Sequence, residues 1–255
     1  MMRLRFLGTG TSTGVPQIGC TCETCISTDS HDKRLRASAI LSIGDKNILL
    51  DCGPDFRTQI IDAGAVHLDA ALLTHSHYDH VGGIDDLRPY CYRNGGFALY
   101  CRPDVAEDLR NRVPYCFKEH PYPGVPIFNI HEIGDEPFDV DGIEVTPLPV
   151  YHYKLPIVGY RIGNFAYIVD AKTIPDSTFE LLHGIDTLTI NALRIEEHMS
   201  HMSLSQCLAA IERINPRVAY LTHMADRIGL HRKVEPTLPT GVHLAYDGLT
   251  IEIAE

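Results

Sequence analysis

The segment His75-Ser76-His77-Tyr78-Asp79-His80 places four metal-binding side chains within six residues, directly after the apolar run Ala70 to Thr74. Residues two apart in an extended segment project to the same side, so His75 and His77 can converge on one cation. Asp79 and His80 follow where the chain turns toward a helix, and they can face a second cation. Imidazoles and carboxylates suit zinc, manganese or iron better than calcium. This spacing therefore predicts a site for two divalent metal ions.

Three more candidate ligands occur at the polar ends of apolar runs. His152 follows Val145 to Val150, Asp170 follows Tyr167 to Val169, and His223 follows Val218 to Leu221. Active sites of layered α/β folds gather at strand ends, so residues that are distant in sequence can meet at one edge. We therefore expect these three side chains to join the first four.

Many short strand-like runs with helices interspersed predict two sheets covered by helices in one globular domain, residues 1–255. Gly44-Asp45-Lys46 predicts a hairpin turn, and Asp55 to Ala63 and Ser203 to Ile214 have helical spacing. Pro89 to Pro137 is less regular, and we interpret it as an insert near the site, where His120 could approach a substrate. The expected strands are Leu4–Leu7, Ser38–Ile43, Asn47–Leu50, Ala70–Thr74, Ile143–Val150, Gly159–Ile162, Ala166–Val169, Thr187–Ile190, Arg217–Thr222, Val242–Ala245 and Leu249–Ile253.

The composition narrows the class of partner. A formal net charge of -11 disfavours nucleic acid, which is usually bound by a basic patch, and favours a small anionic substrate held beside metal ions. No stretch approaches the roughly 20 apolar residues of a membrane span, and no signal peptide follows Met1 to Phe6, so we expect a cytoplasmic protein without a membrane partner.

In that compartment the eight cysteines are expected to be metal ligands or packing residues rather than disulfides. Packing is expected for Cys52, Cys91, Cys101, Cys116 and Cys207.

Taken together, the ordered candidates resemble the ligand set of the metallo-β-lactamase superfamily, and Asp51 matches an earlier aspartate motif of that superfamily. The resemblance covers nearly the whole chain and implies an αββα four-layer sandwich. It also implies that Asp170 bridges two cations. One cation would be bound by His75, His77 and His152, and the other by Asp79, His80 and His223. True β-lactamases of this superfamily are exported and commonly have Cys at the position of Asp170, so antibiotic hydrolysis is disfavoured.

Two further motifs indicate a branch of the superfamily. Phe6-Leu7-Gly8-Thr9-Gly10 resembles the phosphodiesterase and ribonuclease Z branch, and Gly19-Cys20-Thr21-Cys22-Glu23-Thr24-Cys25 resembles the PhnP-type (phosphoribosyl cyclic phosphate) phosphodiesterases. In that family such cysteines help to bind a third, structural zinc, and thiolates at this spacing can surround one tetrahedral ion. The family places a histidine three residues after the last ligand, whereas this chain has Asp226, which could serve as an oxygen ligand. A homodimer is an expectation that rests on the resemblance alone.

His201 is the expected catalytic histidine, together with Asp79. The segment Ser200-His201-Met202-Ser203-Leu204 precedes a predicted helix and resembles the family position of a histidine that acts without binding metal. An imidazole there could protonate a leaving oxygen or stabilise a charged phosphoryl oxygen. His198 is a close competitor, and Ser203 is a good N-cap in either case.

These features predict a binuclear metal-dependent hydrolase that cleaves small or cyclic phosphodiesters. Two such cations can activate water and stabilise both oxygens of an in-line displacement. The alternatives are a ribonuclease Z-like tRNA 3′ endonuclease, then a glyoxalase-II-like thioester hydrolase, then a non-catalytic metal-binding protein. The sequence leaves open the substrate, and it does not distinguish zinc from manganese or iron.

Overall fold

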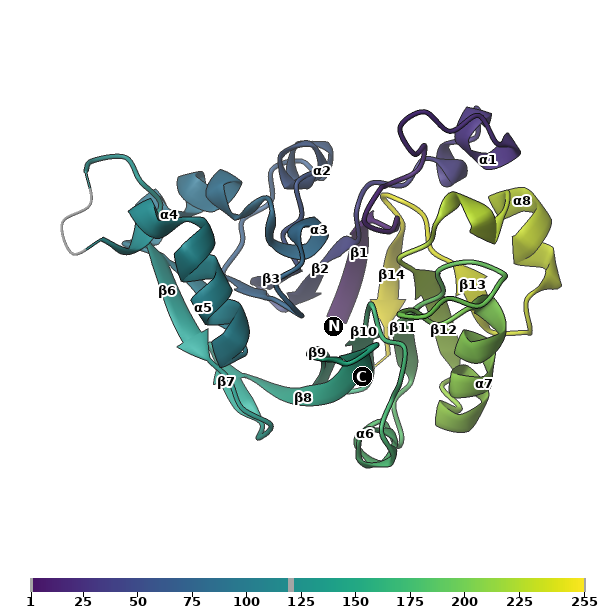
Figure 1. The fold of residues 1–255 in the computed structure, drawn as a ribbon. Helices are drawn as coiled ribbons and strands as arrows, with labels where there is room; N and C mark the ends of the chain where they lie inside the picture. The colour runs from purple at the N-terminus through teal and green to yellow at the C-terminus, as the bar shows by residue number, and fades with distance from the viewer. Residues whose placement is uncertain (1, 119–121, 255) are drawn as a thin grey trace.

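Two mixed β-sheets stack face to face and carry helices on both outer faces (Figure 1). The computed structural model describes residues 2–118 and 122–254. Within these residues each sheet has seven strands, which is the αββα sandwich predicted from the sequence. In sheet order, the first sheet contains β14 (Thr250–Ile253), β1 (Met2–Gly8), β2 (Ser38–Ile43), β3 (Lys46–Leu50), β4 (Ala70–Leu72), β5 (Phe97–Cys101) and β6 (Phe128–Glu132). The second contains β13 (Val242–Leu244), β12 (Val218–Thr222), β11 (Thr187–Asn191), β10 (Phe165–Ile168), β9 (Leu155–Ile162), β8 (Ile143–His152) and β7 (Phe138–Val140).

Both sheets are antiparallel in one part and parallel in the other. β14, β1, β2 and β3 pair antiparallel, and β3 to β6 pair parallel. In the second sheet, β7 to β10 pair antiparallel and β10 to β13 pair parallel. The carboxyl ends of the parallel strands in each sheet meet at one edge, and that edge carries the candidate site.

Three apolar clusters hold the four layers together. One lies between the first sheet and its helices, one between the two sheets, and one between the second sheet and its helices. None of the helices in the described residues is long and apolar enough to cross a lipid bilayer. The α-helices are α1 (Glu23–Ile26), α2 (Phe56–Asp62), α3 (Tyr78–Val81), α4 (Arg88–Asn94), α5 (Pro103–Arg112), α6 (Asp176–Leu181), α7 (Leu204–Ile214) and α8 (His231–Val234). The short 3-10 helices are η1 (Ser30–Asp32), η2 (Ile84–Leu87), η3 (Pro114–Phe117), η4 (Asp226–Ile228) and η5 (Glu235–Thr237).

Local sequence signals explain several of these elements. The β2–β3 hairpin turns at Gly44, whose φ of 60° is accessible to glycine at little cost. Ser203 is the N-cap of α7: its side chain accepts from the amide of Gln206, while the Gln206 side chain accepts from the amide of Ser203. This capping box confirms the predicted N-cap.

The region from Pro89 to Pro137 was predicted to be a less regular insert, and this is wrong for most of its length. It contains most of α4, all of α5, and the strands β5 and β6 that complete the first sheet. Two of its prolines start helices: Pro89 and Pro103 lie in the first turns of α4 and α5, where no amide donor is needed. His120 lies outside the described residues.

Candidate metal centre

The candidate ligands follow strands that end at one edge of the sandwich. Asp51 follows β3, His75 to His80 follow β4, His152 ends β8, and Asp170 and His223 follow β10 and β12. Asp51, Asp170 and His223 have φ values of 59°, 61° and 54°, in the left-handed region that residues with a Cβ rarely adopt. Such strain is typical of functional sites, where it aims a side chain at a fixed point.

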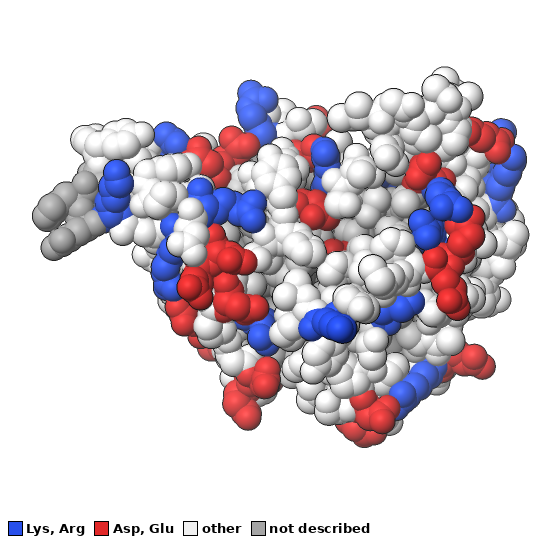
Figure 2. All heavy atoms as spheres, in the orientation of Figure 1, with Lys and Arg blue, Asp and Glu red and all other residues white. Residues whose placement is uncertain are grey.

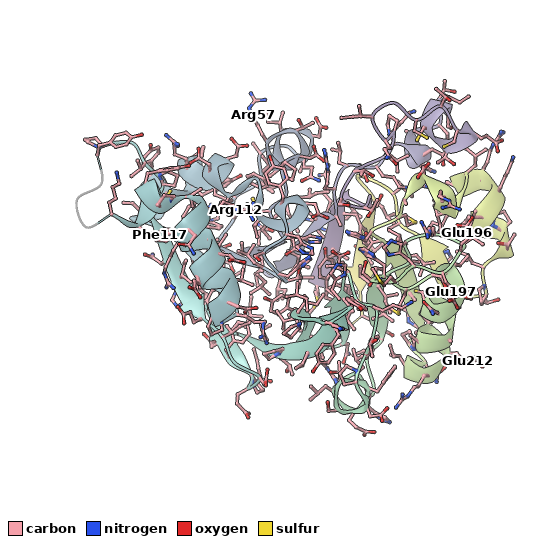
Figure 3. The ribbon with its side chains drawn as sticks, viewed as in Figure 1. Arg57, Arg112, Phe117, Glu196, Glu197 and Glu212 are labelled. Atoms are coloured by element: carbon pink, nitrogen blue, oxygen red, sulfur yellow. The ribbon has the colours of Figure 1, made fainter. Side chains whose placement is uncertain are left out.

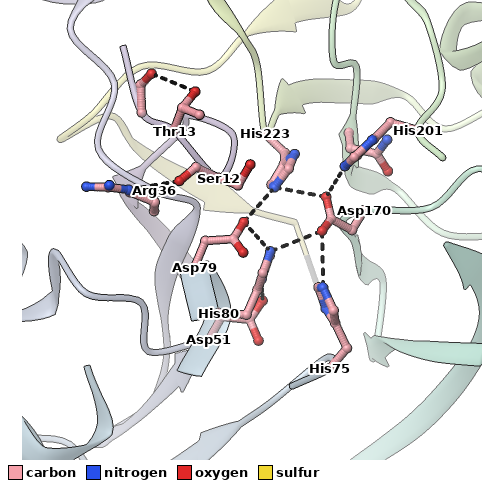
Figure 4. Close-up of polar contacts among 12 residues, drawn as sticks. Ser12, Thr13, Arg36, Asp51, His75, Asp79, His80, Asp170, His201 and His223 are labelled. Atoms are coloured by element: carbon pink, nitrogen blue, oxygen red, sulfur yellow. Dashed lines mark hydrogen bonds and ion pairs between the residues drawn. The ribbon is translucent and has the colours of Figure 1, made fainter. Parts of the chain in front are cut away.

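Asp79, His80, Asp170 and His223 form one buried cluster (Figure 4). His80 Nε2 lies 3.2 Å from Asp79 Oδ2 and 3.3 Å from Asp170 Oδ2. His223 Nε2 lies 2.9 Å from Asp170 Oδ1 and 3.4 Å from Asp79 Oδ2. Ligand atoms about 2.1 Å from one metal ion are separated by about 3.0 to 3.4 Å in octahedral or tetrahedral geometry, so these separations fit a shared cation.

His75, His77 and His152 form a second cluster on the other side of Asp170. The ring centroids of His75 and His77 are 4.6 Å apart, those of His77 and His152 are 5.2 Å apart, and His75 Nε2 is 3.1 Å from Asp170 Oδ2. His152 Nδ1 lies 2.9 Å from the Asp170 carbonyl oxygen, to which an Nδ1–H would donate, leaving Nε2 free. The structure thus brings together all the predicted ligands of both cations, with Asp170 between the clusters.

The charges and unpaired atoms of these clusters fit divalent cations. The buried atoms His75 Nε2, His80 Nε2 and Asp170 Oδ1 lie at ion-pair distance from their neighbours but form no hydrogen bond of good geometry, which is costly unless a metal engages them. Burial opposes ionisation of Asp170, but the charge of His223 and close contacts with the surrounding histidines outweigh burial and hold its pKa well below the usual range. Burial also opposes protonation of His223, yet Asp170 raises the pKa of His223 to about 9. The carboxylates that attract a proton here would equally attract a cation.

The second cluster is prepared to ligate at neutral pH. Burial lowers the pKa of His75, His77 and His152, and neighbouring histidines add to this effect. Neutral imidazoles are the form that binds metal. These three rings therefore need not lose a proton first.

Asp51 orients two of the candidate ligands, His80 directly and His75 through Thr74. Its Oδ2 lies 2.7 Å from His80 Nδ1 and accepts from Thr74 Oγ1, and its Oδ1 accepts from the amide of Thr74. An imidazole that donates from Nδ1 keeps Nε2 free for a metal. Thr74 Oγ1 is also 3.0 Å from His75 Nδ1, so one buried carboxylate supports ligands of both cations.

The helix α5 holds the ligand loop from the outside, and sequence reasoning missed this contact. Arg112 Nη2 donates to Ser76 O at 3.0 Å, and Asp108 accepts from the Ser76 hydroxyl. Figure 3 shows Arg112 pointing from α5 toward the middle of the molecule. Nothing in the spacing of residues 104–112 indicated this role, because it depends on where β5 places the helix.

His201 lies at the outer side of Asp170, as expected for a histidine beside the metals. Its Nε2 is 3.2 Å from Asp170 Oδ1, and its ring centroid is 4.6 Å from that of His152. Its Nδ1 is 3.1 Å from His198 Nδ1 and 3.0 Å from Ser200 Oγ. His198 therefore contacts His201 rather than the metal clusters, and His201 is the better placed of the two candidates.

The three clustered cysteines meet Asp226 away from the main site. The Cys22 and Cys20 thiols donate to Asp226 Oδ2 at 3.2 and 3.5 Å, and Cys25 completes the group, whose ligand atoms all lie within 4.8 Å of one another. Burial raises the pKa of the Cys25 thiol to about 12. The other five cysteines are buried, which confirms them as packing residues. Asp226, the first residue of η4, comes three residues after His223. One short segment therefore links the cysteine cluster to the histidine clusters.

The profile of a beta-lactamase superfamily domain matches residues 46–224. This match, the αββα sandwich and the clustered histidines define the class: the chain belongs to the metallo-β-lactamase superfamily.

Among its relatives is a solved structure described as a new diphosphatase from the PhnP family, which is 36% identical, has a TM-score of 0.93, and covers 100% of this chain and 98% of that chain. The chain therefore has PhnP-like relatives. It is also 44% identical to the octanoyltransferase of Porphyromonas gingivalis over 257 residues, which cover 100% of this chain and 52% of that protein. Coenzyme PQQ synthesis protein B of Methylorubrum populi is 32% identical over 229 residues, 77% of this chain and 74% of that protein. The chain thus spans about half the length of the octanoyltransferase.

Proposed function

We propose that the chain is a binuclear metal-dependent hydrolase that cleaves P–O bonds in small phosphodiesters, including cyclic diesters and diesters of diphosphate. The observation that carries the proposal is the convergence of two histidine clusters on the buried Asp170, with His201 at its outer side. The likeness to a PhnP-family diphosphatase supports phosphorus as the centre attacked. Because ligands come from both sheets, we also propose that residues 1–255 act as one catalytic unit.

The chain's own residues would divide the work. Two divalent cations, zinc or manganese, would supply activated water and neutralise phosphoryl charge when bound. His75, His77 and His152 would hold one cation, Asp79, His80 and His223 the other, and Asp170 both. His201, which reaches Asp170 through Nε2, would give a proton to the departing oxygen. A third, structural zinc would be held by Cys20, Cys22, Cys25 and Asp226.

A small substrate agrees with the surface of the protein. Figure 2 shows acidic and basic side chains interspersed around a central hollow, without a continuous basic stripe on this face. Together with the net charge of -11, this favours a small anion over a polynucleotide.

The test is hydrolysis of bis-p-nitrophenyl phosphate by metal-loaded protein. His77→Ala should lose metal and activity together, and His201→Ala should keep its metal while kcat falls by about 10²- to 10⁴-fold. His183→Ala is the matched control, because His183 is exposed and outside the site. Full metal content without turnover of linear, cyclic or diphosphate diesters would refute the proposal.

A second candidate comes from the relative named octanoyltransferase. Its name points to acyl chemistry, and the same pair of cations could activate water against an acyl thioester. Release of free thiol from an octanoyl thioester, faster than release of p-nitrophenol from the phosphodiester, would favour this reading.

A further inference from the structure

The loop Gly10 to Gly14 is fixed against the metal centre from two sides. On one side the Thr11 amide donates to Met224 O at 3.1 Å, directly after the ligand His223. On the other side Arg36 Nε donates to Ser12 O at 3.2 Å. Figure 4 shows Ser12 beside Asp79 and His223. The middle of the loop is therefore held at the rim of the cluster.

Packing explains the glycines of this loop. A Cβ on Gly10 would lie 2.7 Å from Arg34 O, which is too close. Gly14 has a φ of 63° and closes a turn by donating to Thr11 O at 2.8 Å. Neither close packing nor a positive φ requires a glycine at Ser12 or Thr13. These two residues occupy the central positions of the turn and are exposed.

Ser12 and Thr13 present hydrogen-bond donors that no protein group uses. In the described part of the chain, neither the two amides nor the Ser12 hydroxyl has a hydrogen-bond partner, whereas Thr13 Oγ1 donates to Gly14 O at 3.3 Å. Arg36 binds Asp55 through Nη1 at 2.9 and 3.1 Å. This ion pair balances the Arg36 charge, so the subsite rests on the donors of the turn, because successive free amides in a turn make a concavity that suits an anion.

We propose that the Ser12 hydroxyl and the amides of Ser12 and Thr13 bind a second phosphoryl group, next to the one that is cleaved. The substrate class is then a diester of diphosphate rather than a diester with a single phosphorus atom. This inference rests on the proposed function, since the metal centre must engage the first phosphoryl group.

Equilibrium binding tests the subsite without turnover. Isothermal titration calorimetry on metal-loaded protein would compare a methylene-bridged diphosphate diester with a phosphodiester that has one phosphorus atom. The native protein should bind the diphosphate analogue at least about tenfold more tightly, and Ser12→Ala should remove about tenfold of that preference, as expected for a hydrogen bond to a charged group. Ser12→Thr keeps a hydroxyl and should retain most of it. Ser30→Ala, a matched loss of an exposed hydroxyl outside the loop, should change neither constant.

Two results would overturn the proposal. One is equal binding of the two ligands by the native protein, and the other is an equal loss for both ligands in Ser12→Ala. A preference that depends on Ser12 would support the subsite even if no ester were hydrolysed, and that combination would count against the proposed function alone.

Discussion

Asp51 contacts His80 and Thr74, and through them it would act on the proposed metal ions. Replacing it by Asn keeps the size but places an amide where the carboxylate receives His80 Nδ1, 2.7 Å away. The amide favours the wrong imidazole tautomer, and loss of such a partner typically costs about 10- to 100-fold in metal affinity. We expect this loss in Asp51→Asn, measured by competition with a chelator.

Asp69→Asn is the matched control for Asp51→Asn. Asp69 accepts from the Asn47 amide at 2.8 Å, at the opposite end of the same two strands. Equal metal affinity in the two variants would show that Asp51 does not orient His80.

Asp247 makes stability depend on pH. Burial raises its pKa to about 7, although hydrogen bonds from the Leu35 amide and Thr9 oppose the shift. The unfolded chain ionises near 3.9, so the folded state binds the extra proton between these values. The stabilisation is full below about pH 4 and is lost as the pH rises to about 7.

The free energy of unfolding of the native protein should therefore fall as the pH rises from 5 to 8. In Asp247→Asn this fall should be smaller by about 2 kcal/mol. Urea unfolding at both pH values measures the difference. Parallel pH profiles for the two proteins would show that the carboxyl ionises normally in the fold.

The backbone after β3 and the backbone around α3 approach each other closely, and this contact fixes the position of α3. Gly53 follows β3 and Gly83 follows α3, and a Cβ on Gly53 would overlap Asp79 O while one on Gly83 would overlap Gly53 O. We expect Gly53→Ala and Gly83→Ala each to lower the free energy of unfolding by about 3 kcal/mol, because a rigid backbone cannot yield as a side chain can.

Gly134→Ala is the control for both variants, since a Cβ there meets nothing within 4 Å. Chemical denaturation of the three variants gives the comparison. A loss in Gly134→Ala as large as in the other two would point to glycine's general flexibility instead of this contact.

Sequence patterns predicted the elements that follow simple rules. The dense motif after β4 and the capping box at Ser203 are local, so spacing alone identified them. Phe97–Cys101 was missed because β5 is buried on both faces and lacks the alternation of a half-exposed strand. The contacts of Arg112 and Ser12 could not be predicted, since each depends on elements that only the assembled sheets bring together.

At the scale of the whole molecule, the two metal sites should respond separately. Cys22→Ser removes a thiol from the cysteine cluster and leaves the histidine clusters intact, so elemental analysis should show one metal fewer and retained diester turnover. His77→Ala should instead lose metal from the histidine clusters together with diester turnover, and keep the metal of the cysteine cluster. Loss of all metals in Cys22→Ser would instead mean that the segment from His223 to Asp226 couples the sites tightly.

Removal of all metals should destabilise the fold. The clusters place carboxylates and imidazoles in the interior, and cations that bind only the folded state add about 2.7 kcal/mol at a hundredfold excess over Kd. Dialysis against a chelator should lower the melting temperature in calorimetry, and zinc or manganese should restore it. An unchanged melting temperature would show that the clusters do not bind these ions strongly.

The position of Asp170 between the clusters has a consequence for how the chain folds. Asp79 and His223 are separated by 144 residues, yet their side chains lie 3.4 Å apart across the sandwich. During synthesis His75 to His80 emerge long before Asp170, and His223 emerges later still. Contacts of such long sequence separation form slowly. A cation site that needs Asp170 and His223 would therefore be completed only after the two sheets have docked.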